Sequence, residues 1–523
     1  MKRTVMMAAA LTLTLPALPA FAGSHKPVAP AASSLTRPVE STTHGAVTVE
    51  GHRIGYDAVA GTIILRNKKD QPTESMFYVA YLKRGVRNPA DRPITFFYNG
   101  GPGSSSVWLH MGAFGPERVL TGDHTHTANP PYHLVNNDYS LLDATDMVFI
   151  DAPSTGFSRH IPKKDGGAGK PSMYWGVDSD GRAFAQFINR FLTRFNRWNS
   201  PKYLFGESYG TMRSAVLASD LELNDNIDLN GVVLLSQTLN YDISNADDPE
   251  DNPGMGLSYE LALPTYAATA WYHHKLPGQP RDLQTFLEKV EHFAMHGYAD
   301  ALNAGTDLTA QQEQQVAEQL HQYTGLPAAY WVKANLRVNG GEFEKNLLAG
   351  SDESTGRLDT RFAGPSMDPL SQEAQYDPQA AAISSAYISG FNSYVRNTLH
   401  FKPGYMQYRP EIALWGSKWD WQHQPPSADT PLPMAPNVMP DLAAAMKYNP
   451  NLKVQLEAGY FDLATPFYAA VYAMKHLQIP RSLASNISYH YYESGHMVYV
   501  HVPALKKLHD NVAAFIHSTE GSK

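Results

Sequence analysis

The chain of 523 residues contains no cysteine. Disulfide bonds and thiolate metal sites are therefore excluded, and the fold must be held by its core alone. An excess of positive charge is also missing, because the formal net charge is −8. That balance argues against nucleic acid or an anionic membrane as a partner. Beyond the first 22 residues, no stretch is apolar over the length that a membrane span needs.

Residues 1–22 have the pattern of a removable secretory signal. Lys2 and Arg3 form the charged start, Thr4 to Pro19 the apolar middle, and Ala20-Phe21-Ala22 the cleavage site. The alternative is an N-terminal membrane anchor, which the short, proline-broken apolar segment disfavours. Cleavage removes both basic residues and no acidic one, so the net charge falls from −8 to −10. The signal and the missing cysteines together predict a periplasmic or secreted bacterial protein.

Buried β-type runs alternate with helical patterns in two parts of the chain. A helical stripe between Asp180 and Asn199 leads directly into one of the runs. This alternation predicts a mostly parallel sheet covered by helices on both faces. The predicted core strands are Ile94–Tyr98, Met147–Ile150, Tyr203–Phe205, Gly231–Leu235, Leu452–Glu457 and Ile487–Tyr492.

Clear β-type runs stop between about Asn240 and Phe401. A helical stripe covers Leu283–Phe293, and Thr309 with Gln312 forms a capping box that opens a helix ending near Gly325. The polar stretch from Ser351 to Pro378 predicts a loop. We therefore expect a flexible leader over 23–42, a catalytic domain over 43–240 and 410–523, and a mainly helical lid inserted over 241–409.

Gly206-Glu207-Ser208-Tyr209-Gly210 lies between a predicted strand and a predicted helix. Gly-x-Ser-x-Gly in that context is a nucleophile elbow, a tight turn that holds the serine hydroxyl clear of the sheet. Without that context the pattern also arises by chance. The elbow predicts an α/β-hydrolase fold with Ser208 as nucleophile.

An elbow serine needs a base and an orienting acid, which this fold supplies in the order Ser, Asp, His. Asp462 follows the first returning strand, and His496 follows the second, beside Gly495. We expect His496 to take and return the proton, and Asp462 to hold the imidazole tautomer and stabilise its cation. The alternatives are a helix N-cap for Asp462 and an ordinary loop histidine for His496.

Asn99-Gly-Gly-Pro-Gly-Ser-Ser-Ser106 follows the Ile94 strand and is the expected source of oxyanion donors. A plain turn or a phosphate loop are the alternatives, but no lysine follows the glycines as a phosphate loop requires. The pairs His124/His126 and His273/His274 lack a carboxylate at ligand spacing. The sequence therefore predicts neither a metal site nor a cofactor.

The motifs beginning at Asn99, Gly206, Gly459 and Gly495 occur in the order found in serine carboxypeptidases, and the chain resembles that family between about residues 94 and 500. Asp151-Ala-Pro-Ser-Thr-Gly-Phe-Ser158 resembles a further family block, one residue shorter than usual. The resemblance implies an α/β-hydrolase with a catalytic triad and an oxyanion hole formed by backbone N–H groups. It also implies residues that bind the substrate's terminal carboxylate, and a leaving-group pocket. The implied residues are Ser208, Asp462 and His496 for the triad, Gly101 and Tyr209 for the oxyanion hole, and Asn99, Gly100 and Glu207 for the carboxylate. Met497 is the implied residue of the leaving-group pocket, and the alternative for Met497 is a packing residue.

Three departures from the family pattern affect the expected specificity. The second glutamate of the family's carboxylate clamp is replaced by Ala113, which puts strict exopeptidase action in doubt. Ser104 stands in place of a cysteine, and Tyr499 in place of a common proline. A glutamate beside the nucleophile binds a carboxylate only when protonated, so such enzymes favour acid pH.

We expect a serine peptidase of the carboxypeptidase type that acts on peptides through an acyl-enzyme. The alternatives are an esterase, an acyltransferase or a broader peptidase with the same triad. A prolyl aminopeptidase is disfavoured by Asn99, and a non-catalytic binding relative by the presence of all triad members. The sequence does not decide the oligomeric state, and a homodimer is one alternative.

Overall fold

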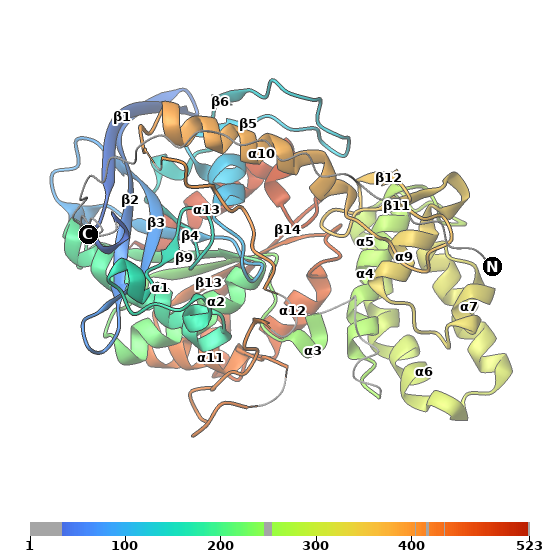
Figure 1. The fold of residues 1–523 in the computed structure, drawn as a ribbon. Coiled ribbons are helices and arrows are strands. Elements are labelled where there is room, and N and C mark those ends of the chain that lie inside the picture. The colour runs from blue at the N-terminus through green and yellow to red at the C-terminus, as the bar shows by residue number, and fades with distance from the viewer. Residues whose placement is uncertain (1–33, 245–253, 403, 415–417, 433–434, 521–523) are drawn as a thin grey trace, which may run out of the picture.

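The computed structural model describes residues 34–244, 254–402, 404–414, 418–432 and 435–520. A twisted sheet runs through its larger part, and a group of helices lies to one side (Figure 1). The strand order is β1-β2-β3-β7-β4-β9-β10-β13-β14, with β8 pairing at the edge of β3. Pairing is antiparallel from β1 to β7 and parallel from β7 to β14. This is the mostly parallel sheet of an α/β-hydrolase, as predicted.

The parallel strands are short, and all but the edge strand β14 are largely apolar and buried on both faces. Their bounds are β4 Ile94–Tyr98, β7 Asp146–Ile150, β9 Lys202–Glu207, β10 Gly231–Leu235, β13 Lys453–Gly459 and β14 Ile487–Tyr492. The antiparallel edge is formed by longer strands, β1 Glu40–Val49, β2 His52–Arg66 and β3 Pro72–Lys83. Shorter strands are β5 Glu117–Val119, β6 Leu134–Asn136 and β8 Arg159–His160.

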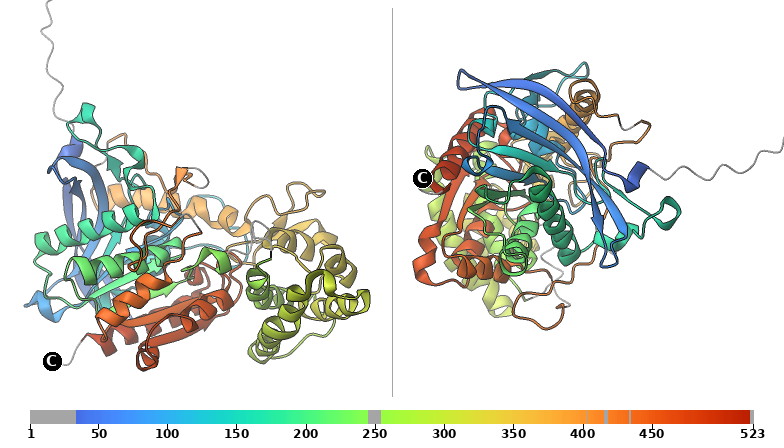
Figure 2. Two further views of the ribbon diagram at one scale, coloured as in Figure 1. Left: turned by 90° about the horizontal axis from the view of Figure 1, so that it is seen from below. Right: turned by 90° about the vertical axis from the view of Figure 1, so that its left-hand side faces the viewer.

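Alternate residues of each strand face opposite sides of the sheet. Phe96 and Leu204 belong to one core cluster and Phe97 and Phe205 to the other. The first face is covered by α1 Val177–Phe195, α2 Tyr209–Ser219 and α11 Met439–Tyr448, and the second by α13 Val502–Thr519. The two covering layers are visible in Figure 2.

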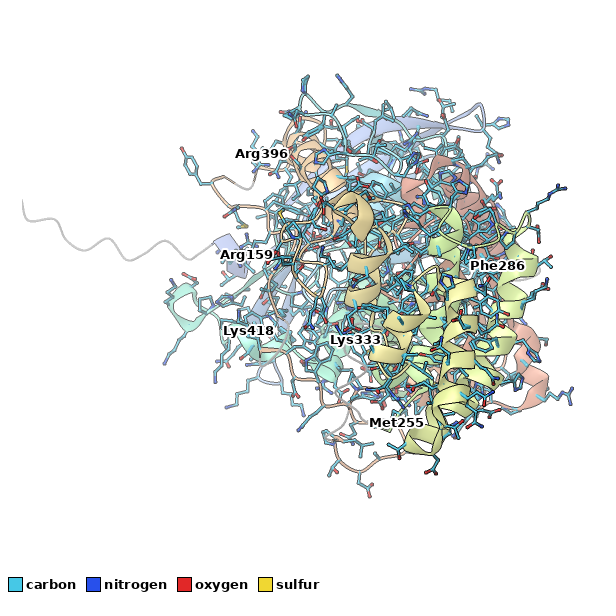
Figure 3. All side chains as sticks on the ribbon, turned by 90° about the vertical axis from the view of Figure 1, so that its right-hand side faces the viewer. Arg159, Met255, Phe286, Lys333, Arg396 and Lys418 are labelled. Carbon is cyan, nitrogen blue, oxygen red and sulfur yellow. The ribbon has the colours of Figure 1, made fainter. Side chains whose placement is uncertain are left out.

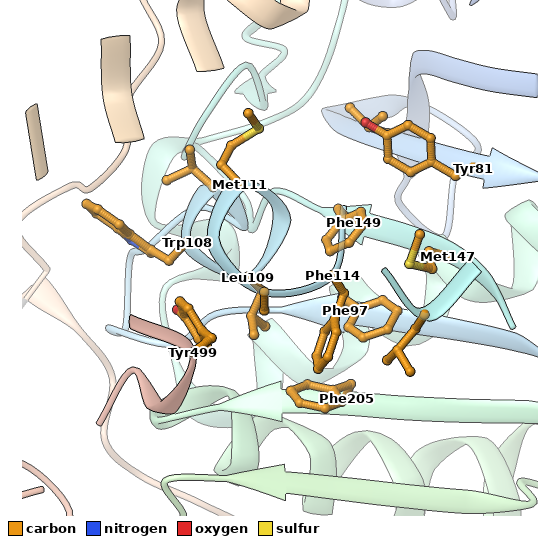
Figure 4. Close-up of a cluster of buried hydrophobic side chains, with 14 of the residues drawn as sticks. Tyr81, Phe97, Trp108, Leu109, Met111, Phe114, Met147, Phe149, Phe205 and Tyr499 are labelled. Atoms are coloured by element: carbon orange, nitrogen blue, oxygen red, sulfur yellow. The ribbon is translucent and has the colours of Figure 1, made fainter. Parts of the chain in front are cut away.

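A π-helix, η3 (Leu109–Phe114), packs on the second face directly after the glycine-rich loop. Figure 4 shows Phe114, Phe97, Phe149 and Phe205 in contact around it, with Trp108 at the other end of the cluster. This aromatic packing fixes the start and end of the loop 99–108 relative to the sheet.

The first helices after β10 have the bounds α3 Tyr241–Ser244, α4 Leu257–Tyr272, α5 Leu283–Phe293, α6 Ala299–Ala304, α7 Ala310–Thr324, α8 Ala328–Lys333 and α9 Gly340–Leu347. Ile243 of α3 belongs to a small cluster with Leu261 and Ala469, and α4 to α9 share a larger apolar cluster. Figure 3 views this end of the molecule, with Phe286 on α5 and Lys333 on α8. The cluster also includes Phe461 and Phe467, which follow β13, so it is anchored beside the loop that carries Asp462.

The last helix of the insertion, α10 (Pro378–Asn397), packs differently from the others. Its buried residues, including Tyr387 and Phe391, join the core cluster of the sheet's second face. In Figure 1, α10 accordingly lies along the sheet rather than within the group of helices. The division of the chain into a catalytic domain and a lid spanning 241–409 stays a prediction.

Several predicted boundaries agree with the structure, and two differ. The strands Gly231–Leu235 and Ile487–Tyr492 and the capping box of α7 are confirmed. Residues 40–42, expected in a flexible leader, belong to β1, because Glu40–Val49 pairs along its whole length with β2. The Ser351–Pro378 loop contains a small hairpin, β11 Glu353–Thr355 and β12 Ala363–Pro365. The predicted signal at 1–22 lies outside the described residues.

Candidate active site

Ser208 occupies the turn between β9 and α2. Its backbone has φ 63° and ψ −132°, a conformation that L-residues rarely adopt. A side chain at Gly206 would overlap the Gly210 carbonyl, so this glycine is required by the close approach across the turn. The Ser208 N–H donates to the Leu235 carbonyl on β10 at 3.0 Å. The elbow is thus locked to the neighbouring strand with the serine at its apex.

Asp462 and His496 come together after β13 and β14. His496 Nδ1 lies 2.9 Å from Asp462 Oδ2. The Thr465 hydroxyl donates to the same Oδ2 at 2.7 Å, and the Thr465 N–H donates to Oδ1 at 2.9 Å. Asp462 therefore orients the imidazole and caps the turn at Thr465, and it is not the N-cap of the following helix, whose N-cap is Pro466.

The surroundings of His496 favour its protonated form, which a general base must adopt during catalysis. Burial disfavours the charged imidazole, but the Asp462 carboxylate outweighs it through its charge and hydrogen bond, and the pKa of His496 is raised. The Ser236 hydroxyl, directly after β10, donates to the His496 carbonyl at 2.7 Å and so fixes the loop that carries His496. A protonated His496 is thereby stabilised in place, as general base catalysis requires.

A cavity of about 530 Å³ opens at the serine. Ser208 and His496 both line it, whereas Asp462 lies behind the histidine and is fully buried. Of the other predicted site residues, Asn99, Gly100, Gly101, Glu207 and Met497 also line the cavity. Further lining residues that the motifs did not indicate are Trp108, Arg357, Leu358, Ile383 and Glu411.

The glycine-rich loop packs against the start of α2. Gly100 approaches the backbone nitrogens of Tyr209 and Gly210 so closely that a side chain there would overlap them. Gly101 has φ 102°. The side chain of Tyr209 is buried and packs edge-on against Trp419. The arrangement brings the two predicted oxyanion donors, the N–H groups of Gly101 and Tyr209, to neighbouring segments at the serine.

Glu207 is buried beside the serine and is held by Tyr499. The Tyr499 hydroxyl donates to Glu207 Oε2 at 2.9 Å. Burial raises the pKa of Glu207 to about 7, although the charge of His496 and the Tyr499 hydrogen bond act in the opposite direction. Asn99 Oδ1 accepts the Leu109 N–H at 3.2 Å, which orients the Asn99 amide in the same corner. Figure 4 shows Tyr499 beside Leu109 at the edge of the aromatic cluster.

The Asp151 block supports the glycine-rich loop from the next strand. Asp151 Oδ1 accepts hydrogen bonds from the Ser106 N–H at 3.0 Å and the Ser106 hydroxyl at 2.9 Å. Burial raises the pKa of Asp151 to about 6. This contact lies under the loop rather than in the cavity, so its role is to position the residues that line the cavity.

A strap from the insertion, which we define as residues 356–362, runs along both catalytic loops. The Arg357 carbonyl accepts the N–H groups of Leu463 and Ala464, each at 3.1 Å, next to Asp462. The Leu358 carbonyl accepts the His496 N–H at 2.6 Å. The polar residues 351–378 predict a loop, and no local pattern in them indicates that the backbone of the strap pairs with segments more than 100 positions away.

The strap is held by an ion network in which Asp359 and Arg361 are buried and Asp123 is partly exposed. Arg361 Nη2 lies 2.6 Å from Asp359 Oδ2, and Arg361 Nη1 lies 3.0 Å from Asp123 Oδ1. Asp359 Oδ2 also accepts the Gly495 N–H at 3.2 Å, and a side chain at Gly495 would overlap Asp359. The glycine that precedes His496 is therefore required by the close approach of the strap.

Within the described residues, no group of three or more His, Asp or Glu side chains is arranged to hold a metal ion. His273 Nε2 instead lies 2.7 Å from the Thr360 carbonyl on the strap. Among the helices that the structure describes, none is long and apolar enough to cross a membrane.

The sheet, the elbow and the Asp462–His496 pair define an α/β-hydrolase, with the serine and histidine at one cavity and the aspartate behind the histidine. A family model described as "Serine carboxypeptidase" matches residues 61–502. The chain therefore belongs to the serine carboxypeptidase family. The site residues discussed above, from Asn99 to Tyr499, all fall within the matched range.

Comparisons with individual proteins show more distant likeness. "Serine carboxypeptidase-like 45" of Arabidopsis thaliana is 28% identical over 166 residues, 30% of each chain. "Pheromone-processing carboxypeptidase KEX1" of Saccharomyces cerevisiae is 29% identical over 156 residues, 29% of this chain and 20% of the yeast protein. The chain thus spans less than a third of the length of these curated relatives. The crystal structure of the yeast protein has a TM-score of 0.53 at 16% identity, covers 88% of this chain and 92% of its own, and supports the fold.

Proposed function

We propose that this protein is a serine carboxypeptidase that removes C-terminal residues of peptides through an acyl-enzyme on Ser208. The observation that carries the proposal is the juxtaposition of Ser208, His496 and Glu207 at one cavity, with Asp462 bonded to the imidazole. Membership of the serine carboxypeptidase family supports the same activity.

In this mechanism Ser208 attacks the carbonyl of the last peptide bond while His496 takes its proton. Asp462 and Thr465 hold the imidazole, and the N–H groups of Gly101 and Tyr209 stabilise the oxyanion. His496 then returns the proton to the leaving amine, and water hydrolyses the acyl-enzyme by the reverse roles. Met497 and Trp108, both at the cavity, line the pocket for the leaving residue.

Glu207, Asn99 and Gly100 are the proposed contacts for the substrate's terminal carboxylate. Glu207 donates a hydrogen bond to a carboxylate only in its protonated form, and its pKa is raised to about 7 by burial. Affinity for substrates with a free terminal carboxylate is therefore expected to be full at acid pH and to fall as the pH rises through about 7.

One N-blocked dipeptide, offered as free acid, C-terminal amide and ester from about pH 4 to pH 8, tests this function. A preference for the free acid that fades with rising pH supports the carboxypeptidase. Equal or better cleavage of the amide or ester overturns it. Ser208→Ala should remove turnover, by about 10⁴-fold or more, while the circular dichroism spectrum stays unchanged. Retained activity in Ser208→Ala would show that the nucleophile is another residue.

The second candidate is an esterase, an acyltransferase or a broader peptidase with the same triad. Two observations favour this second candidate. The fully buried Ala113 stands where the family has its second glutamate, and one carboxyl oxygen of Glu207 already accepts a hydrogen bond from Tyr499. The ester and amide arms of the same experiment identify this candidate. A non-catalytic relative is less favoured, and labelling of Ser208 by a fluorophosphonate probe excludes it.

We further propose an exported bacterial protein, periplasmic or secreted, whose signal at 1–22 is removed. The charged start, apolar middle and small-residue cleavage site support this location. Peptides are the proposed binding partners, and we propose that the protein binds no nucleic acid, no membrane after signal removal and no cofactor. A homodimer is one possible state of assembly. N-terminal sequencing of protein exported from a bacterial host tests the cleavage, and sedimentation tests the assembly.

A further inference from the structure

Arg213 on α2 follows Tyr209 by four residues, and its side chain is completely buried. A charge in such a place needs protein groups that replace water. The guanidinium Nε lies 2.6 Å from Asp180 Oδ2 on α1, and Nη1 donates to the Asn99 carbonyl at 2.7 Å. One guanidinium therefore joins α1, α2 and the first residue of the glycine-rich loop.

The same guanidinium lies against the ring of Tyr209. Its Cζ is 5.3 Å from the centroid of that ring and 4.4 Å from the centroid of the Phe184 ring. Cations are attracted to aromatic rings, and the attraction is stronger where water is excluded. The Asn99 carbonyl belongs to the peptide immediately before the one that carries the Gly101 N–H. Arg213 thus contacts both segments that supply the proposed oxyanion donors.

Arg213 is a costly residue for a buried position. Its Nη2 has no hydrogen-bond partner within the part of the chain that the structure describes, and a buried unpaired donor destabilises a fold. A buried ion pair is often no more stable than apolar side chains of the same volume. The pair with Asp180 alone therefore does not explain the arginine, whereas the contacts with Asn99 and Tyr209 connect it to the active site.

We propose that Arg213 is a positioning residue that holds both oxyanion donors, the N–H groups of Gly101 and Tyr209, in register at Ser208. Its fork of donors orients the Asn99 peptide, and its charge holds the Tyr209 ring. An oxyanion hole is effective because its donors are already in place when negative charge develops on the substrate oxygen. The inference deepens the proposed function and rests on it for the identity of the two donors.

Arg213→Lys tests the proposal, because lysine keeps a cation for Asp180 and loses the planar fork that also reaches the Asn99 carbonyl. The substrate is N-blocked Phe-Leu at about pH 6, in whichever form, free acid, amide or ester, wild type cleaves best. We expect kcat to fall about tenfold or more and KM to change less than about twofold, since a displaced oxyanion donor weakens transition-state binding. An unchanged kcat overturns the inference.

Inhibition by N-blocked phenylalaninal separates oxyanion positioning from a general loosening of the fold. The Ser208 oxygen adds to the aldehyde carbon, the carbonyl electron pair moves onto the oxygen, and His496 retains the serine proton. The adduct presents an oxyanion to the same N–H groups, so its inhibition constant should rise by the factor by which kcat/KM falls. An inhibition constant that keeps its wild-type value while kcat falls overturns the inference.

The matched control is Arg197→Lys. Arg197 is also buried, with Nη1 2.6 Å from Asp146 Oδ2 and Nη2 donating to the Arg92 carbonyl at 2.7 Å. These contacts lie at the amino ends of β7 and β4, away from the carboxyl ends where the site is built. Arg197→Lys should leave kcat and the aldehyde inhibition constant unchanged. An equal fall of kcat in both variants overturns the inference, because the loss of any buried fork would then lower activity.

Asp180→Asn/Arg213→Met decides the question if Arg213→Lys fails to fold. It removes both charges, so no unpaired ion is left in the core, and it should unfold at a denaturant concentration near that of wild type. Because the Asn99 peptide and the Tyr209 ring lose their common contact, kcat should again fall about tenfold or more. Full kcat in this variant overturns the inference. The proposed function fails separately, when wild type cleaves the amide or ester of Phe-Leu as well as the free acid.

Discussion

The hydroxyl of Tyr499 donates a 2.9 Å hydrogen bond to Oε2 of Glu207, the residue next to the nucleophile. A buried glutamate is costly to ionise, and a donor on its carboxylate reduces that cost. Tyr499 stands where the family commonly has proline, and the ring lies against η3, where a side chain at Gly112 would overlap it. Burial raises the pKa of Glu207, the residue proposed to bind the terminal carboxylate, and the tyrosine opposes part of that rise.

Replacing Tyr499 by Phe should move the pH dependence of substrate binding. The lost hydrogen bond favoured the ionised form, so the pKa of Glu207 should rise above about 7. The pH at which KM for a free-acid dipeptide increases should then move upward by about one pH unit, the equivalent of one modest hydrogen bond to a charged group. KM against pH for the free acid checks this.

The control for this change is Tyr298→Phe, which removes a hydroxyl bonded to the Leu336 carbonyl far from the cavity. It should leave the profile in place. A profile of Tyr499→Phe that coincides with wild type, or one that shifts equally for the dipeptide amide, would show that Glu207 does not govern carboxylate binding.

The Thr465 hydroxyl should matter for turnover rather than for binding. It donates to Asp462 Oδ2 at 2.7 Å and lies 3.2 Å from His496 Nδ1, so it fixes the carboxylate against the imidazole. Thr465→Val keeps the shape and removes the donor. We expect kcat to fall about tenfold while KM stays the same, because misplacement of the acid affects the transition state. Thr465→Ser should restore most of kcat, and a Thr465→Val enzyme with full kcat would contradict the assigned role.

Replacing Asp359 on the strap should lower both the free energy of unfolding and kcat. Asp359→Asn leaves Arg361, a buried cation, with Asp123 as its remaining ionic partner, and weakens the acceptor of the Gly495 N–H. Breaking a buried pair costs about 3 kcal/mol, so the free energy of unfolding should fall by that order. The loosened Gly495–His496 segment should also lower kcat, with KM nearly unchanged.

Asp70→Asn is the matched control for the strap. It removes the partner of Arg66 in an exposed pair at 3.7 Å, which is worth no more than about 1 kcal/mol. Denaturant unfolding and steady-state kinetics on both variants decide the point. Equal, small effects would mean that the strap does not hold the catalytic loop.

The sequence was sufficient for features that are encoded locally. The elbow, the strands after it and the α7 capping box follow from short patterns whose partners are at most a few residues away. The first residues of β1, 40–42, were placed in the leader because this polar run has little hydrophobicity and is stabilised by its register with β2. Tertiary pairing decides such edge strands.

The site, too, has features that short sequence patterns predict and contacts that they do not predict. The order of serine, aspartate and histidine after successive strands predicts which loops meet, because parallel strands bring their carboxyl ends to one edge. Nothing in that rule predicts that Tyr499 reaches Glu207 across 292 positions, or that Arg357 enters the cavity from the insertion. These contacts depend on how the insertion and the last loop pack, which short patterns do not encode.

Glu457 on β13 should make the stability of the fold depend on pH. Glu457 is fully buried, accepts hydrogen bonds from Tyr492 and Gln455, and has its pKa raised by burial to about 8. An unfolded glutamate titrates near 4.5. Between those values the folded state binds more protons than the unfolded state, so the free energy of unfolding falls as the pH rises from about 4.5 to about 8.

Glu457→Gln cannot ionise, and the slope that Glu457 contributes should disappear. At pH 8.5 the variant should be more stable than wild type by about 2 kcal/mol or more, since each unit of pKa difference is worth ~1.4 kcal/mol. Near pH 4.5 the two should unfold at nearly the same denaturant concentration. Glu74, also buried with its pKa raised to about 8, is present in both proteins and cancels in the comparison. Exposed Glu288→Gln is the control and should change stability little at either pH. If Glu457→Gln were less stable than wild type at pH 8.5, the carboxylate would be a net stabilising group at alkaline pH, and burial would not be what dominates its titration.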